Sequence, residues 1–243
     1  PDIIISCGSS VAPVNVLLSI ENQSRSVAIL KPSIVGYGRF DRVIMPAHDR
    51  PPRRKNVVVT QAALNLIDEA YLADHAGRLA GIAVLPQPPA WSIGVLLGGD
   101  TKQFRLEPER VRVVLEQLKH AAQVLEATLL LTTSRRTSPA VETVVKGLLS
   151  GEARCAVQLI ANEKNVPFAV GGILGASRIA VVSPESISMV SEAISSRRQV
   201  IVFDAPGLSG KHRAFLRSCA AHRYIHLVAP DRLSATIERI VSQ

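Results

Sequence analysis

Short aliphatic and β-branched runs alternate with segments of helical periodicity along the chain, and this alternation most restricts its fold. Such alternation is typical of βα units, in which parallel strands form a sheet and helices cover both faces. Strands are expected at residues 2–6, 26–30, 42–45, 56–59, 92–97, 128–132, 156–160, 179–182, 200–203 and 225–228. Helices are expected at residues 12–21, 61–75, 108–124, from 138 onward and at about 231–241. The expected fold class is therefore α/β with parallel sheets.

Three prolines, Pro86, Pro88 and Pro89, interrupt this alternation after about a third of the chain. Proline removes a backbone donor and disfavours a helix before it, so the segment is a natural hinge. We expect two Rossmann-like domains, residues 1–88 and 89–243, each of a size that can bury its own core.

The composition excludes several classes of protein. Hydrophobic residues make up 47% of the chain and aromatic residues 4%, which predicts an aliphatic core. No apolar run approaches the roughly 20 residues of a membrane span. The cysteine usage indicates a reducing compartment, so a cytoplasmic protein is expected, with peripheral association at a membrane as the alternative. Cys7, Cys155 and Cys219 form no C-x-x-C pair, and the six histidines lack metal-ligand spacing. Neither a disulfide framework nor a bound metal is expected.

The net charge of +8 favours anionic partners. Phosphate esters, nucleic acid and an acidic membrane surface are the three classes that fit. Nucleic acid ranks last, because the chain lacks the aromatic residues on which bases stack.

Ligands of open parallel sheets bind beyond the carboxyl ends of the strands, so the loops there are the candidate sites. Gly98 and Gly99 follow one expected strand, where glycine lets backbone amides approach a phosphate. Ser134, Arg135 and Arg136 follow the next and lead into a helix, whose N-terminus favours anions. An oxyanion site is predicted at these loops, with a plain turn and a capping loop as the alternatives.

The stretch from 183 to 193 is the most informative. Ser186 and Ser188 lie at the start of an expected helix, and Glu192 falls on the same face as Ser188, one turn later. Hydroxyls and amides there can hold a diphosphate, and the carboxylate can accept from ribose hydroxyls. The alternative is that Ser186 caps the helix and Glu192 is solvated.

Two further positions are candidates. Lys211 follows a glycine-rich stretch that lacks the spacing of a P-loop, and it is expected to reach a phosphate from a mobile loop. His48 and Asp49 follow an expected strand in the first domain, and an imidazole beside a carboxylate is a candidate general base. The alternative is that both are ordinary surface residues.

Several stretches together resemble the elongated-mitochondria family of mitochondrial fission proteins, whose bacterial members are described as nucleoside-diphosphate-sugar epimerases or glycosyltransferases. The S-x-S-M-x-S-E-A pattern at 186–193 is the most specific of them. The others are residues 1–8, 40–49, 56–60 and 133–136. The chain departs from the family pattern at residues 9–11 and at Ala62, Arg178 and Glu185.

The resemblance implies a GT-B-like fold, with two Rossmann-like domains facing a nucleotide-sugar cleft. It implies that Glu192 binds the ribose and that Ser186, Ser188, Gly98 and Gly99 contact the diphosphate. It also implies a βα unit upstream of Pro1, so the first domain is expected to be incomplete.

The leading hypothesis is a metal-independent glycosyltransferase-like enzyme that needs no cofactor. It would bind a nucleoside-diphosphate sugar as donor, and His48 or Asp49 would activate an acceptor of unknown identity. The alternatives are a nucleoside-diphosphate-sugar epimerase and a non-catalytic interaction protein of the mitochondrial fission type.

Overall fold

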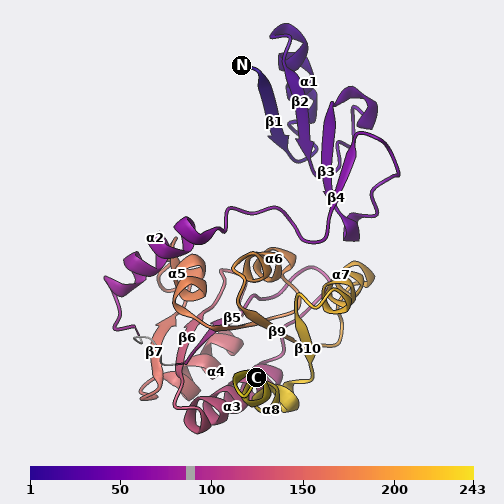
Figure 1. Ribbon diagram of the computed structural model, residues 1–243. Coiled ribbons are helices and arrows are strands. Elements are labelled where there is room, and N and C mark those ends of the chain that lie inside the picture. The colour runs from indigo at the N-terminus through magenta and orange to yellow at the C-terminus, as the bar shows by residue number, and fades with distance from the viewer. Residues whose placement is uncertain (86–90) are drawn as a thin grey trace. The chain divides into compact units, whose positions relative to one another are not determined.

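The computed structural model describes residues 1–85 and 91–243, and these fall into two compact units, Pro1–Leu64 and Asn65–Gln243 (Figure 1). Each unit contains a parallel sheet, which confirms the expected α/β class. The proline segment expected as the hinge, residues 86–89, lies outside the described residues.

The first unit has four parallel strands in the order β1-β2-β3-β4. They are β1 Ile3–Cys7, β2 Arg25–Ile29, β3 Arg42–Pro46 and β4 Val57–Thr60. The helix α1 (Ala12–Glu21) has a proline in its first turn, where the missing amide costs no helical hydrogen bond. Ala12 packs with Ala28, Phe40, Val43 and Met45 to form the core.

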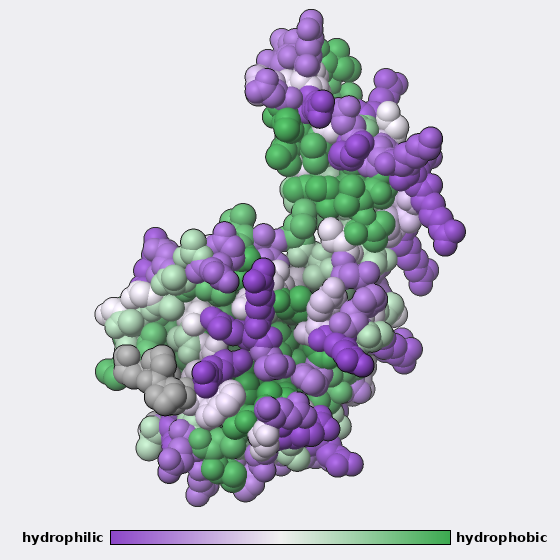
Figure 2. Space-filling view, in the orientation of Figure 1, coloured by the Kyte–Doolittle hydropathy of each residue, from purple (hydrophilic) through white to green (hydrophobic). Residues whose placement is uncertain are grey.

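Hydrophobic residues also lie at the surface of this unit, as Figure 2 shows. Ile3 and Ile5 of β1 are 52% and 64% exposed, and Val58 of β4 is 45% exposed. Side chains alternate between the two faces of a strand, so Ile3 and Ile5 lie on one face. The core residues Ala28, Val43 and Met45 are on the other face.

The second unit contains a six-stranded parallel sheet in the order β10-β9-β8-β5-β6-β7. Its strands are β5 Ser92–Leu96, β6 Thr128–Thr132, β7 Cys155–Leu159, β8 Ile179–Val182, β9 Gln199–Phe203 and β10 His226–Val228. From β5 the chain adds β6 and β7 on one side, and it then crosses back so that β8 pairs with the other side of β5. This is the doubly wound order of a Rossmann fold, and it puts the topological switch point between β5 and β8.

Seven helices are described in this unit. They are α2 Glu69–Ala80, α3 Pro108–Val124, α4 Pro139–Leu149, α5 Ala169–Ala176, α6 Ile187–Ser195, α7 Gly210–Ala221 and α8 Leu233–Val241. The stripe of Val111, Val114, Leu115 and Leu118 on α3 is fully buried, as its spacing predicts. Ser138 caps α4, and its hydroxyl accepts from the amide of Val141.

The helix α2 belongs to the second unit, so the boundary between units lies earlier in the chain than the expected division after residue 88. The physical reason is its packing against α5, where three glycines remove side chains that would separate the helices. A Cβ at Gly175 would lie 2.4 Å from the backbone oxygen of Leu72, and one at Gly172 would lie 2.8 Å from that of His75.

Two helices, α5 and α7, were not expected from the sequence. Glycine is among the poorest helix formers, and α5 contains Gly171, Gly172 and Gly175. Packing against α2 outweighs that low propensity. The helix expected at 61–75 instead begins at Glu69, after the capping side chain of Asp68.

Candidate functional site

The loops after β5 and β8 meet at the switch point, where two hydrogen bonds join them and a third lies within the loop after β8. The Gly98 amide donates to Ser183 Oγ at 2.7 Å, and the Gly99 amide donates to Glu185 Oε1 at 2.7 Å. The Ser183 hydroxyl donates to the same Oε1 at 3.0 Å. The two glycine amides predicted to contact a diphosphate are therefore engaged within the protein.

Both glycines are required by close packing. A Cβ at Gly98 would lie 1.8 Å from Glu185 Oε1, and one at Gly99 would lie 2.1 Å from the backbone oxygen of Arg136. The glycine pair thus allows a buried carboxyl group and a neighbouring loop to approach the end of β5.

That neighbouring loop connects β6 to α4 and carries the predicted Ser134, Arg135 and Arg136. The Thr137 hydroxyl donates to the Gly98 carbonyl at 2.5 Å, and the Asp100 amide donates to the Arg136 carbonyl at 2.9 Å. Ser134 Oγ accepts from the Arg136 amide at 3.0 Å. The loop is therefore fixed against the glycine pair.

The two arginines of this loop differ. Both are exposed, but only Arg136 lies near enough to affect the pKa values of Glu185, on the loop after β8, and of His212, on α7. The side chain of Arg135 makes no hydrogen bond or ion pair with any described residue. Arg136 is consequently the better placed of the two predicted anion ligands.

The helix α6 begins as the sequence predicts. Ser186 is its N-cap, and its hydroxyl accepts from the Met189 amide at 3.4 Å. Ser186 is buried, whereas Ser188 in the first turn is exposed. Capping thus occupies Ser186, and Ser188 is the hydroxyl of this pair that a ligand can reach.

Glu192 lies one turn after Ser188 and is half-buried rather than solvated. Burial raises the pKa of its carboxyl group. Across residues 1–85 and 91–243, no hydrogen-bond or ion-pair partner is found for this carboxylate. A half-buried carboxylate without a donor is costly, because the loss of hydration is not compensated.

Lys211 lies in the first turn of α7, not in a mobile loop. The neighbouring His212 was not singled out in the sequence, yet it links α7 to the switch point. Its Nδ1 lies 2.7 Å from Ser209 Oγ, and the backbone carbonyl of Glu185 faces the ring. Burial lowers the pKa of His212, with Lys211 and Arg136 adding to the effect, while that carbonyl opposes it.

Glu185 is the second residue that sequence reasoning missed. Its side chain is 2% exposed, and burial raises its pKa although its own backbone amide, the hydrogen bonds from Ser183 and Gly99, and the charge of Arg136 act in the opposite direction. The available signal was its position directly after an all-apolar strand, opposite the glycine pair at the switch point.

The candidate catalytic pair belongs to the first unit. His48 and Asp49 form a short 3-10 helix, Ala47–Asp49, directly after the carboxyl end of β3. Both side chains are half-buried. Their position at a strand end agrees with the prediction, and their role as general base stays a prediction.

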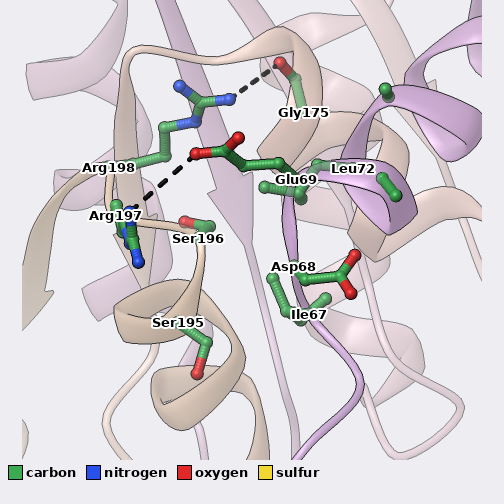
Figure 3. A pocket seen from close by; sticks show the side chains of 11 residues that line it. Ile67, Asp68, Glu69, Leu72, Gly175, Ser195, Ser196, Arg197 and Arg198 are labelled. Atoms are coloured by element: carbon green, nitrogen blue, oxygen red, sulfur yellow. Dashed lines mark hydrogen bonds and ion pairs between the residues drawn. The ribbon is translucent and has the colours of Figure 1, made fainter.

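A pocket of about 820 Å³ lies elsewhere in the second unit, between the start of α2 and the turn from α6 to β9. Figure 3 shows Arg198 directed toward the carbonyl of Gly175 and Glu69 directed toward Arg197. The Arg198 bond measures 3.2 Å, and the exposed Arg197–Glu69 pair is separated by 3.9 Å. This pocket lies at the amino ends of β8 and β9, the edge opposite the switch-point loops.

Outside residues 86–90, no three His, Cys, Asp or Glu side chains are grouped as metal ligands. In the same part of the chain, none of the helices has the length and hydropathy needed to cross a bilayer.

Solved structures share this fold at low sequence identity. A Listeria monocytogenes protein assigned as a UDP-N-acetylglucosamine 2-epimerase has a TM-score of 0.58 and 12% identity, covering 100% of this chain and 66% of its own. Escherichia coli ADP-heptose LPS heptosyltransferase II has a TM-score of 0.56 and 12% identity, covering 100% and 77%.

A third structure was solved with ligands. Methanocaldococcus jannaschii UDP-GlcNAc 2-epimerase, in complex with UDP-GlcNAc and UDP, has a TM-score of 0.52 and 11% identity, covering 99% of this chain and 68% of its own. The chain thus spans about two thirds of the length of the epimerases it matches. These proteins have the GT-B fold, so the expected GT-B-like class with Rossmann-like sheets is confirmed.

A comparison with curated proteins found no match. The model of the family described as Mitochondrial fission ELM1 matches residues 1–239, almost the whole chain. The protein therefore belongs to the mitochondrial fission ELM1 family.

Proposed function

We propose that the second unit binds a nucleoside-diphosphate sugar at the switch point and that the protein is a glycosyltransferase-like enzyme using it as donor. The single observation that carries the proposal is Glu192: a half-buried carboxylate on α6, without a partner among the described residues, one turn after an exposed serine. Ribose has two adjacent hydroxyl groups, and such a carboxylate can accept a hydrogen bond from each of them.

The charges around the site suit the other half of the ligand. The N-termini of α4, α6 and α7 follow β6, β8 and β9, and helix N-termini carry partial positive charge. Arg136 and Lys211 add two cations near His212. These groups would bind a diphosphate and stabilise the charge that grows on it as a leaving group.

The shared fold agrees with this proposal but does not choose a sugar. The M. jannaschii epimerase binds UDP-GlcNAc and UDP, and this makes uridine nucleotides the first ligands to try. In the first unit, His48 and Asp49 are the proposed base for an acceptor hydroxyl.

Calorimetric titration with UDP and UDP-GlcNAc tests the proposal. Glu192→Gln keeps the shape of the side chain but removes its charge, and each hydrogen bond to a charged group contributes about 1.5–3 kcal/mol. We expect affinity to fall roughly ten- to a hundred-fold. Glu116→Gln is the matched control, because Glu116 is an exposed glutamate on α3.

The control should bind as the unaltered protein does. Equal affinities of the Glu192 variant and the unaltered protein would remove Glu192 from the site. Absence of binding to any nucleotide diphosphate would refute the proposed function.

A further inference from the structure

Glu185 is an unusual group to find at an anion site. Its carboxyl group is buried between the loops after β5 and β8, and its Oε1 accepts two hydrogen bonds, from the Gly99 amide and the Ser183 hydroxyl. Its Oε2 is buried and has no hydrogen-bond partner among the described residues. No cation forms an ion pair with it in that part of the chain.

These contacts fit a neutral carboxyl group better than an ionised one. In a neutral carboxyl group the carbonyl oxygen, here Oε1, accepts both hydrogen bonds, and the Oε2 hydroxyl is left without an acceptor among the described residues. An ionised group would place charge on a buried oxygen that nothing solvates, which costs far more than an unpaired neutral oxygen. Two glycines leave room for the group, since a Cβ at Gly98 would overlap Oε1.

The same carboxyl group determines where the anion-binding loop sits. It holds Gly99 directly and Gly98 through Ser183. The Gly98 carbonyl in turn accepts from Thr137, and the Arg136 carbonyl accepts from Asp100. The position of Arg136 thus depends on Glu185 through the glycine pair.

We propose that Glu185 is a positioning residue that carries a proton when the site binds an anion, so that anion binding is coupled to proton uptake. The inference rests on the proposed function, because the anion is the diphosphate of the nucleotide sugar. A negative ligand repels an ionised Glu185 and favours the protonated form. Burial raises the pKa of Glu185 in the free protein, which acts in the same direction.

Other charged groups face this region, and their effects on the pH dependence of binding must be distinguished from that of Glu185. Arg136 comes from the loop before α4, Lys211 and His212 come from α7, and Glu192 comes from α6. His212 can also take up a proton, whereas ionised Glu192 is the form that accepts from ribose.

The coupling has a defined sign. Affinity should rise with pH as Glu192 ionises and should fall again as pH rises through the pKa of Glu185. Above that pKa the loss approaches about tenfold for each pH unit. The resulting profile has two limbs, and each belongs to a different glutamate.

The test is calorimetric titration of UDP-GlcNAc from about pH 5 to about pH 9, in buffers of different ionisation enthalpy. Its diphosphate diester does not titrate near neutral pH. On the falling limb we expect uptake of up to about one proton for each ligand bound. Glu185→Gln should remove this limb and bind within about threefold of the unaltered protein at low pH.

Two variants distinguish the alternatives. Glu185→Ala loses both hydrogen bonds and should bind at least about tenfold more weakly at every pH. His212→Gln should keep the falling limb. A limb that survives in Glu185→Gln and disappears in His212→Gln would overturn the proposal and assign the proton to His212.

NMR of the unaltered protein tests the proposal without requiring that a variant folds. The side-chain carboxyl carbon of Glu185, followed by NMR, reports its ionisation directly. A carboxyl group ionised at neutral pH in the nucleotide complex overturns the inference while the observed binding upholds the proposed function. If Glu185 is protonated but the protein binds no nucleotide diphosphate, both the inference and the proposed function are overturned, because no anion is then coupled to the proton.

Discussion

The amide of Gly99 donates a hydrogen bond of 2.7 Å to Oε1 of Glu185, and so joins the loop after β5 to the loop after β8. In many phosphate sites a glycine pair offers its amides to the ligand. Here the Gly99 amide donates to a buried carboxyl group and the Gly98 amide donates to the Ser183 hydroxyl, so the proposed anion ligands are the cations and helix N-termini around them.

This relationship predicts that Gly98→Ala is destabilising. The added methyl group would lie 1.8 Å from Glu185 Oε1, so the carboxyl group and its hydrogen bonds must shift. Overpacking of this kind costs about 1–3 kcal/mol. Thermal or denaturant unfolding measures the change.

Gly147→Ala is the control for that variant. Gly147 is an exposed residue within α4, and a Cβ there meets nothing within 4 Å. Alanine is favoured over glycine inside a helix by roughly 0.5–1 kcal/mol, so this variant should be slightly more stable. Equal stability of the two variants would contradict the tight packing at Gly98.

The packing of α2 on α5 makes a second prediction. Gly175→Ala would place a methyl group 2.4 Å from the Leu72 carbonyl oxygen, and the helices must separate. We expect a loss of about 1–3 kcal/mol in the unfolding of the second unit. Gly77→Ala on the exposed side of α2 should instead be neutral or stabilising.

Hydrogen exchange locates that effect. If α2 belongs to the second unit, Gly175→Ala should accelerate exchange throughout α2 and leave the first unit, Pro1–Leu64, unchanged. Faster exchange in the strands of the first unit, with α2 still protected, would place α2 there instead.

The sequence predicted the fold class and most strand positions, because buried parallel strands are nearly continuous aliphatic runs. It did not predict α5, since three glycines within eight residues lower helix propensity and only the contact with α2 explains them. For the same reason the prolines at 86–89 did not predict that α2 would pack with the second unit. Composition marks where a chain can bend but not which surfaces pack.

The candidate site was predicted in part. The pattern at 186–193 correctly placed Ser186 at a helix start and Glu192 one turn beyond Ser188, because helix caps and periodicity are local properties. Glu185 and His212 were missed, since a glutamate or histidine in a loop is usually solvated. Their burial depends on Gly98, Gly99 and Ser209, which approach only in the folded protein.

A third prediction concerns the stability of the free protein. Burial raises the pKa of Glu192, so the folded state binds more protons than the unfolded state near that pKa. Stability should therefore decrease as pH rises from the ordinary glutamate pKa through the raised one. Glu192→Gln removes this effect and should raise Tm at neutral pH.

The size of that increase is expected to be a few degrees, because about 1 kcal/mol shifts Tm by roughly 2–4 °C in a unit of this size. Differential scanning calorimetry at several pH values measures it, with Glu116→Gln as the reference. A variant with lower Tm at neutral pH would indicate that Glu192 has a stabilising partner in the free protein.

A fourth prediction separates the two arginines of the loop before α4. Arg136→Gln should weaken UDP binding about tenfold or more, since a charge-assisted bond to phosphate is lost. Arg135→Gln should change affinity by less than about threefold. Calorimetric titration of both variants shows which arginine contributes more to UDP affinity. A larger loss of affinity in Arg135→Gln would contradict the assignment of Arg136 as the main anion ligand.

The most direct test of the central claim is the position of UDP in a crystal structure of the complex. We expect the diphosphate beside Arg136 and the N-terminus of α6, with the ribose hydroxyls within hydrogen-bond distance of the Glu192 carboxylate. UDP bound instead in the pocket between α2 and the α6–β9 turn, or bound nowhere on the second unit, would contradict the account.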